Sequence, residues 1–142
     1  MNSLVIDATS SKIFLVIINS KNIYTSTHEN SKSNFDKLTI FINDFLKNNE
    51  ISINKIDQIY VNRGPGSFAG IRNSLSIVKG IHLSRNIDYF CFSYFDFLDK
   101  KPKNIKYFLE KNIIKPLKWI DIPNLCNKYK IRKNLIKPLY VS

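Results

Sequence analysis

The chain of 142 residues is 44% hydrophobic, which allows one packed core with a small appendage and excludes two full domains. It has no run of about 18 apolar residues, and its first residues lack the basic and long apolar regions of a secretory signal, so we expect a cytoplasmic protein without a membrane span. The formal net charge of +11 favours polyanions or acidic protein surfaces as partners.

The chain opens with short apolar runs that are typical of buried strands. Residues 4–6 and 13–18 are rich in branched side chains, and the small polar residues between them favour a turn. Residues 23–27 alternate in character and predict a third, more exposed strand. We therefore expect a meander of three strands.

Residues 34–48 predict an amphipathic helix. Ser33 and Asp36 have the spacing of a capping box, with Asp in place of the usual Glu. The apolar side chains that share one face of this helix are Phe35, Leu38, Phe41, Ile42 and Phe45.

The next elements alternate between strand and helix. Residues 56–61 predict a strand, residues 68–85 a helix, and residues 87–92 a further strand. Strands separated by helices run parallel, so the later strands should lie beside the opening meander. The order βββαβαβ indicates an α/β fold with a mixed sheet and flanking helices, as in a ribonuclease-H-like or actin-like (ASKHA) half-domain spanning residues 1–99.

The C-terminal part, residues 100–142, has a different character. It has a net charge of +10, against +1 for residues 1–99. Prolines interrupt its pattern, which predicts one short helix at 105–114. Such a segment attracts RNA or an acidic protein surface, although the high content of Lys, Asn and Ile also fits a compositional bias without any binding role. The candidate RNA contacts are Lys128, Lys130, Arg132 and Lys133.

The two cysteines are predicted to be buried free thiols. Cys91 and Cys126 lie far apart in the sequence and have no CxxC spacing, and their neighbours are apolar or aromatic.

A glycine-rich loop is the most informative segment. Three of the four glycines, Gly64, Gly66 and Gly70, fall within seven residues, where glycine allows positive φ or close approach of the backbone to another surface. Pro65 stiffens the turn, and Ser67 is placed to cap the following helix. Arg63 and Arg72 bracket the loop in a chain with only 4 arginines.

Two nucleotide-binding interpretations of this loop fit poorly. The Walker pattern fails because Ala69 stands where its second glycine should be and no Gly-Lys-Ser/Thr follows. The loose G-x-G-x-x-A form of a dinucleotide fingerprint matches, but the expected acid after the next strand is missing.

A family resemblance explains the loop better. Residues 61–72 read Val-Asn-Arg-Gly-Pro-Gly-Ser-Phe-Ala-Gly-Ile-Arg and resemble the signature of the TsaB (YeaZ) family. In that family a GPGSFTGLR-type loop opens a helix ending in a Lys-Gly pair, which matches Lys79 and Gly80 here. Residues 4–10 resemble the family's opening strand and turn, and residues 138–140 resemble its closing Pro-x-Tyr.

The resemblance implies an actin-like fold and a role as a non-catalytic subunit that supports a TsaD-type catalytic subunit, alongside a TsaE-type ATPase. That complex transfers a threonylcarbamoyl group to the adenosine beside the anticodon of tRNAs reading codons that begin with A. The family is also grouped with glycoprotease-like proteins, and we expect no peptidase activity. A stand-alone basic RNA- or nucleotide-binding module with the same fold is the alternative.

The resemblance also implies where partners bind. In the family the helix after the loop forms the partner or homodimer interface, which makes residues 63–68, Gly70, Ile71, Arg72, Leu75 and Lys79 the candidates here. The alternative for Phe68, Ile71 and Leu75 is a place in the core.

This sequence departs from the family pattern in several places. Asn73 and Ser74 replace the usual Ile-Gly, Ala69 replaces Thr, and residues 33–35 replace a His-Ser-Glu start. The second domain is largely absent, so we expect a reduced form with a shortened, Lys-rich C-terminal segment.

No catalytic constellation is apparent, and we expect no catalytic residue, metal or cofactor. TsaD-type catalysis uses a His-x-x-x-His pair, whereas His28 and His82 are far apart and read as surface or structural residues. Asp7 occupies the first carboxylate position of a ribonuclease-H-type nuclease, but Asn62 and Arg63 stand where another carboxylate is needed. Asp7 is also suited to satisfying turn amides.

Overall fold

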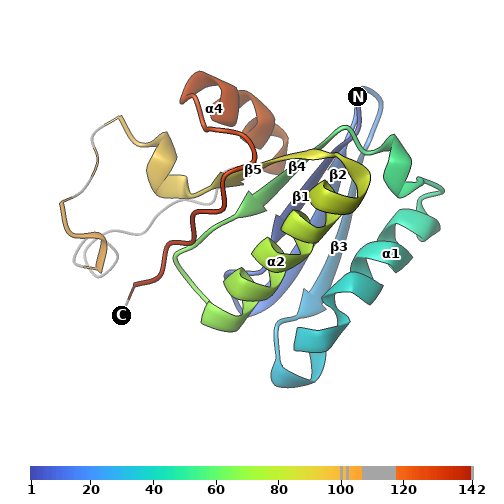
Figure 1. The fold of residues 1–142 in the computed structure, drawn as a ribbon, viewed down its shortest axis with the longest axis horizontal. Helices are drawn as coiled ribbons and strands as arrows, with labels where there is room; N and C mark the ends of the chain where they lie inside the picture. The colour runs from blue at the N-terminus through green and yellow to red at the C-terminus, as the bar shows by residue number, and fades with distance from the viewer. Residues whose placement is uncertain (100, 102, 107–117, 142) are drawn as a thin grey trace.

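The computed structural model describes residues 1–99, 101, 103–106 and 118–141. A five-stranded mixed sheet of order β3-β2-β1-β4-β5 forms its centre (Figure 1). The first three strands are antiparallel, and β4 and β5 add to β1 in parallel, which confirms the predicted meander and its parallel extension. The strands are β1 (Ser3–Asp7), β2 (Lys12–Ile18), β3 (Ile23–Glu29), β4 (Gln58–Asn62) and β5 (Asp88–Phe92).

Two helices, α1 (Leu38–Asn48) and α2 (Phe68–Arg85), lie over one face of the sheet (Figure 1). The strand register places Leu4 of β1 beside Ile17 and Ile59, so alternate side chains point toward these helices. They form the larger hydrophobic core together with apolar residues of both helices. The expected helix at 68–85 is confirmed.

The start of α1 differs from the sequence-based expectation. Residues Lys32–Lys37 form a 3-10 turn, and the α-helix begins only at Leu38. The expected capping box is wrong: the Ser33 hydroxyl pairs with the Ser31 hydroxyl at 2.9 Å, so it does not cap a helix. Local side-chain bonds of this kind compete with helix initiation. The side chain of Phe35 lies outside the described part.

The other face of the sheet carries a second apolar core. It is covered by α4 (Ile122–Lys128) and by a 3-10 turn at Tyr94–Phe97, and Ile122 and Cys126 are buried there against Val5, Val16 and Tyr60. Two further 3-10 turns lie at Ile53–Lys55 and Trp119–Asp121. The short helix expected at 105–114 falls largely outside the described residues.

Residues 131–141, called the C-terminal segment below, wrap around the free edge of β5. Ile131 packs against the second core and Ile136 against the larger core, so the segment crosses from one face of the sheet to the other. Lys133 forms an antiparallel bridge with Phe90 of β5. Figure 1 shows the segment running past β5 on the side opposite β3. No helix in the described ranges is long and apolar enough to cross a membrane.

Candidate functional site

The glycine-rich loop joins the end of β4 to the start of α2. The Ser67 hydroxyl accepts a hydrogen bond from the Gly70 amide at 3.1 Å, which confirms the predicted N-cap. At the other end of the helix, Asn86 adopts a left-handed conformation with φ of 57°, which is a typical way to end an α-helix. The loop therefore fixes where α2 begins and in which direction it runs.

The glycines of this loop permit close contact with the β1–β2 turn. A Cβ atom at Gly66 would lie 2.1 Å from the Thr9 carbonyl oxygen, and one at Gly70 would lie 1.9 Å from the Ala8 carbonyl oxygen. The Ser67 amide donates a hydrogen bond to the Thr9 oxygen at 2.8 Å. The close approach expected from the glycine cluster is therefore made to the chain's own opening turn.

Asp7 holds this turn and the loop together. One carboxylate oxygen accepts from the amide and hydroxyl of Thr9 at 3.0 and 2.7 Å, and the other accepts from the Asn62 side chain at 3.0 Å. The Asn62 oxygen in turn accepts from the Gly64 amide at 3.0 Å. The two segments that carry the family resemblance are thus one hydrogen-bonded unit, and Asp7 satisfies turn amides as expected.

Arg63 connects the loop to the C-terminal segment. Its guanidinium makes a bidentate ion pair with Asp96, at 2.7 and 3.2 Å, and both side chains are largely buried. A third contact reaches the Lys137 carbonyl oxygen at 3.4 Å, and the Leu139 amide donates to the Arg63 carbonyl at 2.8 Å. Gly64 has φ of 116° and packs against the Leu139 carbonyl.

The predicted interface residues separate into two groups. Ile71 and Leu75 are 0% and 4% exposed and belong to the larger core, whereas Phe68 is 59% exposed. Arg72 and Lys79 are also exposed. The exposed members therefore lie on one side of α2, and the buried members fix the helix to the sheet.

A groove runs along this side of α2. It has a volume of about 360 Å³, and its walls are α2 and the C-terminal segment. Tyr140 packs on the ring of Phe68 with 4.7 Å between ring centroids, which joins the segment to the loop. No pattern in the sequence predicts this contact. The residues that line the groove are Arg72, Leu75, Ser76, Lys79, Ile136, Pro138 and Tyr140.

The helical layer also exposes apolar side chains outside the groove. Ile40 on α1 is 54% exposed and Leu83 on α2 is 73% exposed, in addition to Phe68. A second groove of about 180 Å³ lies between α1 and α2, with Ile42, Ile77 and Ile81 among its lining residues. Single exposed apolar side chains are common on protein surfaces, so these three residues do not by themselves indicate an interface.

Both histidines take part in local packing. His28 bonds to the Ser26 hydroxyl at 2.8 Å and stacks on Phe41, while one ring nitrogen of His82 lies 3.0 Å from the Ile87 carbonyl oxygen. Within the described ranges, no group of three His, Cys, Asp or Glu residues is arranged to hold a metal ion.

The cysteines are free and buried, as predicted. Cys91 belongs to the larger core and Cys126 to the second core, so they lie on opposite faces of the sheet. Burial raises the pKa of Cys91 to about 11 and that of Cys126 to about 12. Both thiols are therefore protonated at neutral pH and poorly suited to nucleophilic chemistry.

The four predicted RNA contacts differ in their surroundings. All are exposed, but the Lys133 ammonium pairs with Asp88 at 3.6 Å, and the Lys128 ammonium lies 5.2 Å from the centre of the Tyr129 ring. Lys130 and Arg132 line a cleft beside Arg63.

Comparisons with known proteins agree with the motifs. A family model described as "TsaD: tRNA N6-adenosine threonylcarbamoyltransferase" matches residues 21–96. A curated relative from Buchnera aphidicola subsp. Baizongia pistaciae, "tRNA threonylcarbamoyladenosine biosynthesis protein TsaB", is 37% identical over 71 residues, which cover 44% of this chain and 32% of the relative. The protein of the same name from Buchnera aphidicola subsp. Schizaphis graminum is 29% identical over 98 residues, covering 69% and 47%.

Two solved structures share the fold. YeaZ from Pseudomonas aeruginosa matches with a TM-score of 0.61 and 17% identity over 78% of this chain and 49% of that chain. A protein described as similar to peptidase YeaZ from the same organism matches with a TM-score of 0.61 and 18% identity, over 68% and 45%. The likeness confirms the expected actin-like fold. The chain spans 32% and 47% of the length of the two curated relatives it matches.

Proposed function

The chain belongs to the TsaB (YeaZ) family, and from this premise we propose that it is a non-catalytic subunit in the biosynthesis of threonylcarbamoyladenosine in tRNA. In this proposal it supports a TsaD-type catalytic subunit, which acts with a TsaE-type ATPase on the adenosine beside the anticodon of tRNAs reading codons that begin with A. The chain's own contribution is a docking surface for the catalytic subunit.

The single observation that carries the proposal is the exposed side of α2 beside the signature loop. Phe68 is 59% exposed although its neighbours Gly70 and Ile71 are buried, and Arg72 and Lys79 stand beside the groove. The contacts of Ser67 and Gly70 with the β1–β2 turn hold this surface in one conformation. A rigid surface loses little entropy when a partner binds.

The buried chemistry supports a non-catalytic role. The thiols are protonated and enclosed, and the two histidines are engaged with neighbouring groups of the fold. The Asp7 carboxylate is occupied by Thr9 and Asn62. These groups stabilise the structure in their observed positions.

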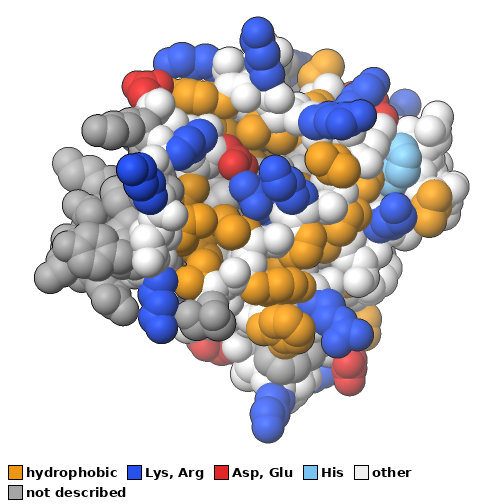
Figure 2. Space-filling model, turned by 60° about the vertical axis from the view of Figure 1, so that its left-hand side comes forward, with side chains coloured by type: hydrophobic (Ala, Val, Ile, Leu, Met, Phe, Trp, Pro, Cys, Tyr) orange, Lys and Arg blue, Asp and Glu red, His pale blue; other side chains and the backbone are white. Residues whose placement is uncertain are grey.

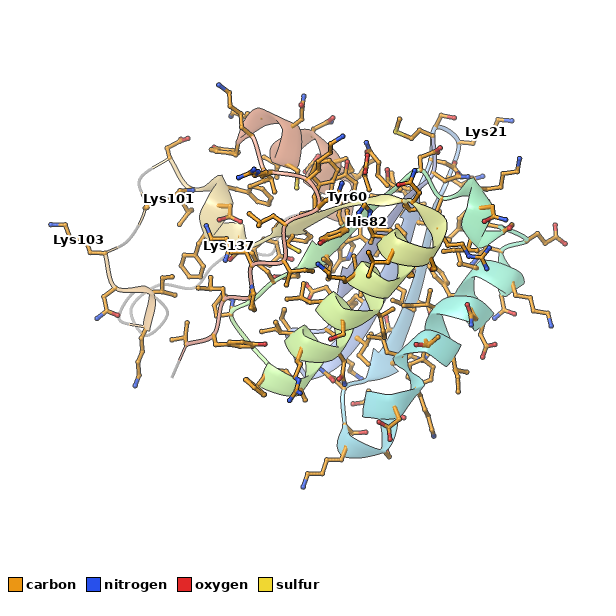
Figure 3. The ribbon with its side chains drawn as sticks, viewed as in Figure 1. Lys21, Tyr60, His82, Lys101, Lys103 and Lys137 are labelled. Carbon is orange, nitrogen blue, oxygen red and sulfur yellow. The ribbon has the colours of Figure 1, made fainter. Side chains whose placement is uncertain are left out.

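The test is co-purification of the chain with the TsaD-type subunit of its own organism, followed by an assay of threonylcarbamoyladenosine formation with and without the chain. Arg72→Glu reverses an exposed charge beside the groove and should weaken association at least about tenfold, or about 1.4 kcal/mol. Lys21→Glu is the matched control, because Lys21 lies on the β2–β3 turn, far from the start of α2 (Figure 3).

Association and product formation that are both reduced by Arg72→Glu, and not by Lys21→Glu, would support the proposal. Equal effects of the two substitutions would contradict it. A second copy of the chain could occupy the same surface instead. Light scattering of the chain alone tests this, because a homodimer would have twice the mass of the single chain. No association with the catalytic subunit would favour the stand-alone RNA- or nucleotide-binding module.

A further inference from the structure

A second cleft lies on another part of the surface, between the end of β5, the turn at Tyr94–Phe97 and the C-terminal segment. Its volume is about 290 Å³, and four cationic side chains line it together with one carboxylate, Asp96. These cations, Arg63, Lys130, Arg132 and Lys137, and the space between them are called the cationic cleft below.

The cations of this cleft come from an anchored part of the chain. The Asn134 amide donates to the Tyr89 carbonyl at 2.8 Å, and the Asn134 side chain accepts from the Tyr89 amide at 3.0 Å. Arg63 reaches the Lys137 carbonyl oxygen from the other side. Figure 3 shows Lys137 on the C-terminal segment. These bonds give the cleft a defined shape.

The charge in the cleft is largely uncompensated. The Asp96 carboxylate already has close partners. Its two oxygens bind the Arg63 guanidinium, and one of them also accepts a hydrogen bond from the Ser93 amide at 2.8 Å. No carboxylate in the described ranges pairs with Lys130, Arg132 or Lys137. On the side of the molecule in Figure 2, blue Lys and Arg side chains dominate the charged surface and red carboxylates are sparse.

We propose that the cationic cleft binds a backbone phosphate of RNA, with Lys130, Arg132 and Lys137 as the contacting residues. The choice of RNA rests on the proposed function in tRNA modification, while the choice of a phosphate rests on the cleft itself. The volume lies at the low end for ligand pockets and suits a compact anion, and Arg132 can form paired bonds to phosphate oxygens.

This proposal separates the cations of the C-terminal part into two groups. Neither Lys128 nor Lys133 lines the cleft; Lys133 is paired with Asp88, and Lys128 lies over Tyr129. The distinction supplies a matched control within six residues of chain.

The experiment measures binding of fluorescently labelled tRNA to the full chain, without the catalytic subunit, across a salt series. The double variant Lys130→Gln/Arg132→Gln removes two charges from the cleft, and Lys128→Gln/Lys133→Gln removes two charges beside it. Because the salt slope scales with the number of phosphates neutralised, losing the one phosphate of the cleft should lower it by about 0.7 to 0.9. We expect the affinity of the first variant to fall at least tenfold at low salt, and that of the control less than threefold.

Equal losses in the two double variants would overturn the proposal, as would no binding of tRNA at about 100 mM salt. Displacement by polyglutamate as effective as by unlabelled tRNA would assign the cleft to an acidic protein and also overturn it. Inorganic phosphate alone should compete only at far higher concentration than tRNA, and competition at equal concentration would assign the site to a free anion. Co-purification of Lys130→Gln/Arg132→Gln with the TsaD-type subunit tests the docking proposal separately, because neither residue lines the groove beside α2.

Discussion

Replacing Gly70 by alanine should destabilise the fold, although alanine normally favours a helix. The added Cβ would lie 1.9 Å from the Ala8 carbonyl oxygen, whereas real Cβ atoms essentially never come closer than 3.0 Å to such a neighbour. The obstacle is backbone, and Asn30 holds it by donating a hydrogen bond to the same oxygen at 2.8 Å. The start of α2 must therefore move away from the β1–β2 turn.

The expected cost follows from that movement. Overpacking costs about 1 to 3 kcal/mol, and loss of the Ser67–Thr9 hydrogen bond adds about 1 kcal/mol. The gain in helix propensity offsets about 0.5 to 1 kcal/mol, which leaves a net loss of about 1 to 3.5 kcal/mol. Urea unfolding measures this difference through the midpoint, provided that the slope of the transition is unchanged.

Gly80→Ala is the matched control on the same helix. A Cβ atom at Gly80 would meet nothing within 4 Å, so this substitution should stabilise the protein by about 0.5 to 1 kcal/mol. If Gly70→Ala proved as stable as Gly80→Ala, the close approach between loop and turn would not constrain the fold, and the argument for a rigid docking surface would fail with it.

Two further predictions concern buried groups. Asp96→Asn should cost about 2 to 4 kcal/mol in urea unfolding, because the largely buried Arg63 loses its bidentate partner, and a loss below about 0.5 kcal/mol would mean that water replaces the pair. Stability should also fall as pH rises above about 9, because Cys91 and Cys126, with raised folded-state pKa values of about 11 and 12, ionise first in the unfolded chain. Each thiol lowers the free energy of unfolding by up to about 1.4 kcal/mol per pH unit. Cys126→Ala should therefore flatten the decline between about pH 9 and 11, measured by denaturation curves across a pH series. An unchanged dependence of the unfolding free energy on pH would contradict the role of this thiol.

Local patterns in the sequence were sufficient for most of the sheet and for α2. The alternation of residues 23–27 predicts a half-exposed strand, and β3 has that burial pattern. The Ser67 cap and the apolar spacing predict α2 with its observed bounds. The glycine cluster also predicts a close backbone approach, although only the structure identifies the β1–β2 turn as the neighbour.

The remaining features depend on contacts between distant parts of the chain. Arg63 meets Asp96 and Lys137, which are 33 and 74 residues away in the sequence, and no periodicity encodes such pairings. Pro138 fits the irregular backbone of the C-terminal segment, but an irregular backbone gives no indication that it covers the β5 edge. The expectation that Pro123 interrupts the pattern is wrong, because this proline lies in the first turn of α4, where a proline is tolerated. The start of α1 differs from the expectation because of local contacts and not distant ones. The Ser33 hydroxyl bonds to the Ser31 hydroxyl and does not cap a helix, although its spacing from Asp36 fits a capping box.

The wrapping of the C-terminal segment has a consequence for synthesis of the protein on the ribosome. Residues 1–97 contain all strands found in the described part of the chain and the helices that cover one face of the sheet. Most of the cover of the other face and of the β5 edge comes from α4 and the C-terminal segment, which extend to residue 141. At about 5 to 20 residues per second, the nascent chain needs about 2 to 9 seconds to supply them. During that interval Tyr60 and Phe92 lie on an apolar face that only the turn at Tyr94–Phe97 covers, so this is the period in which the nascent chain is most exposed to aggregation.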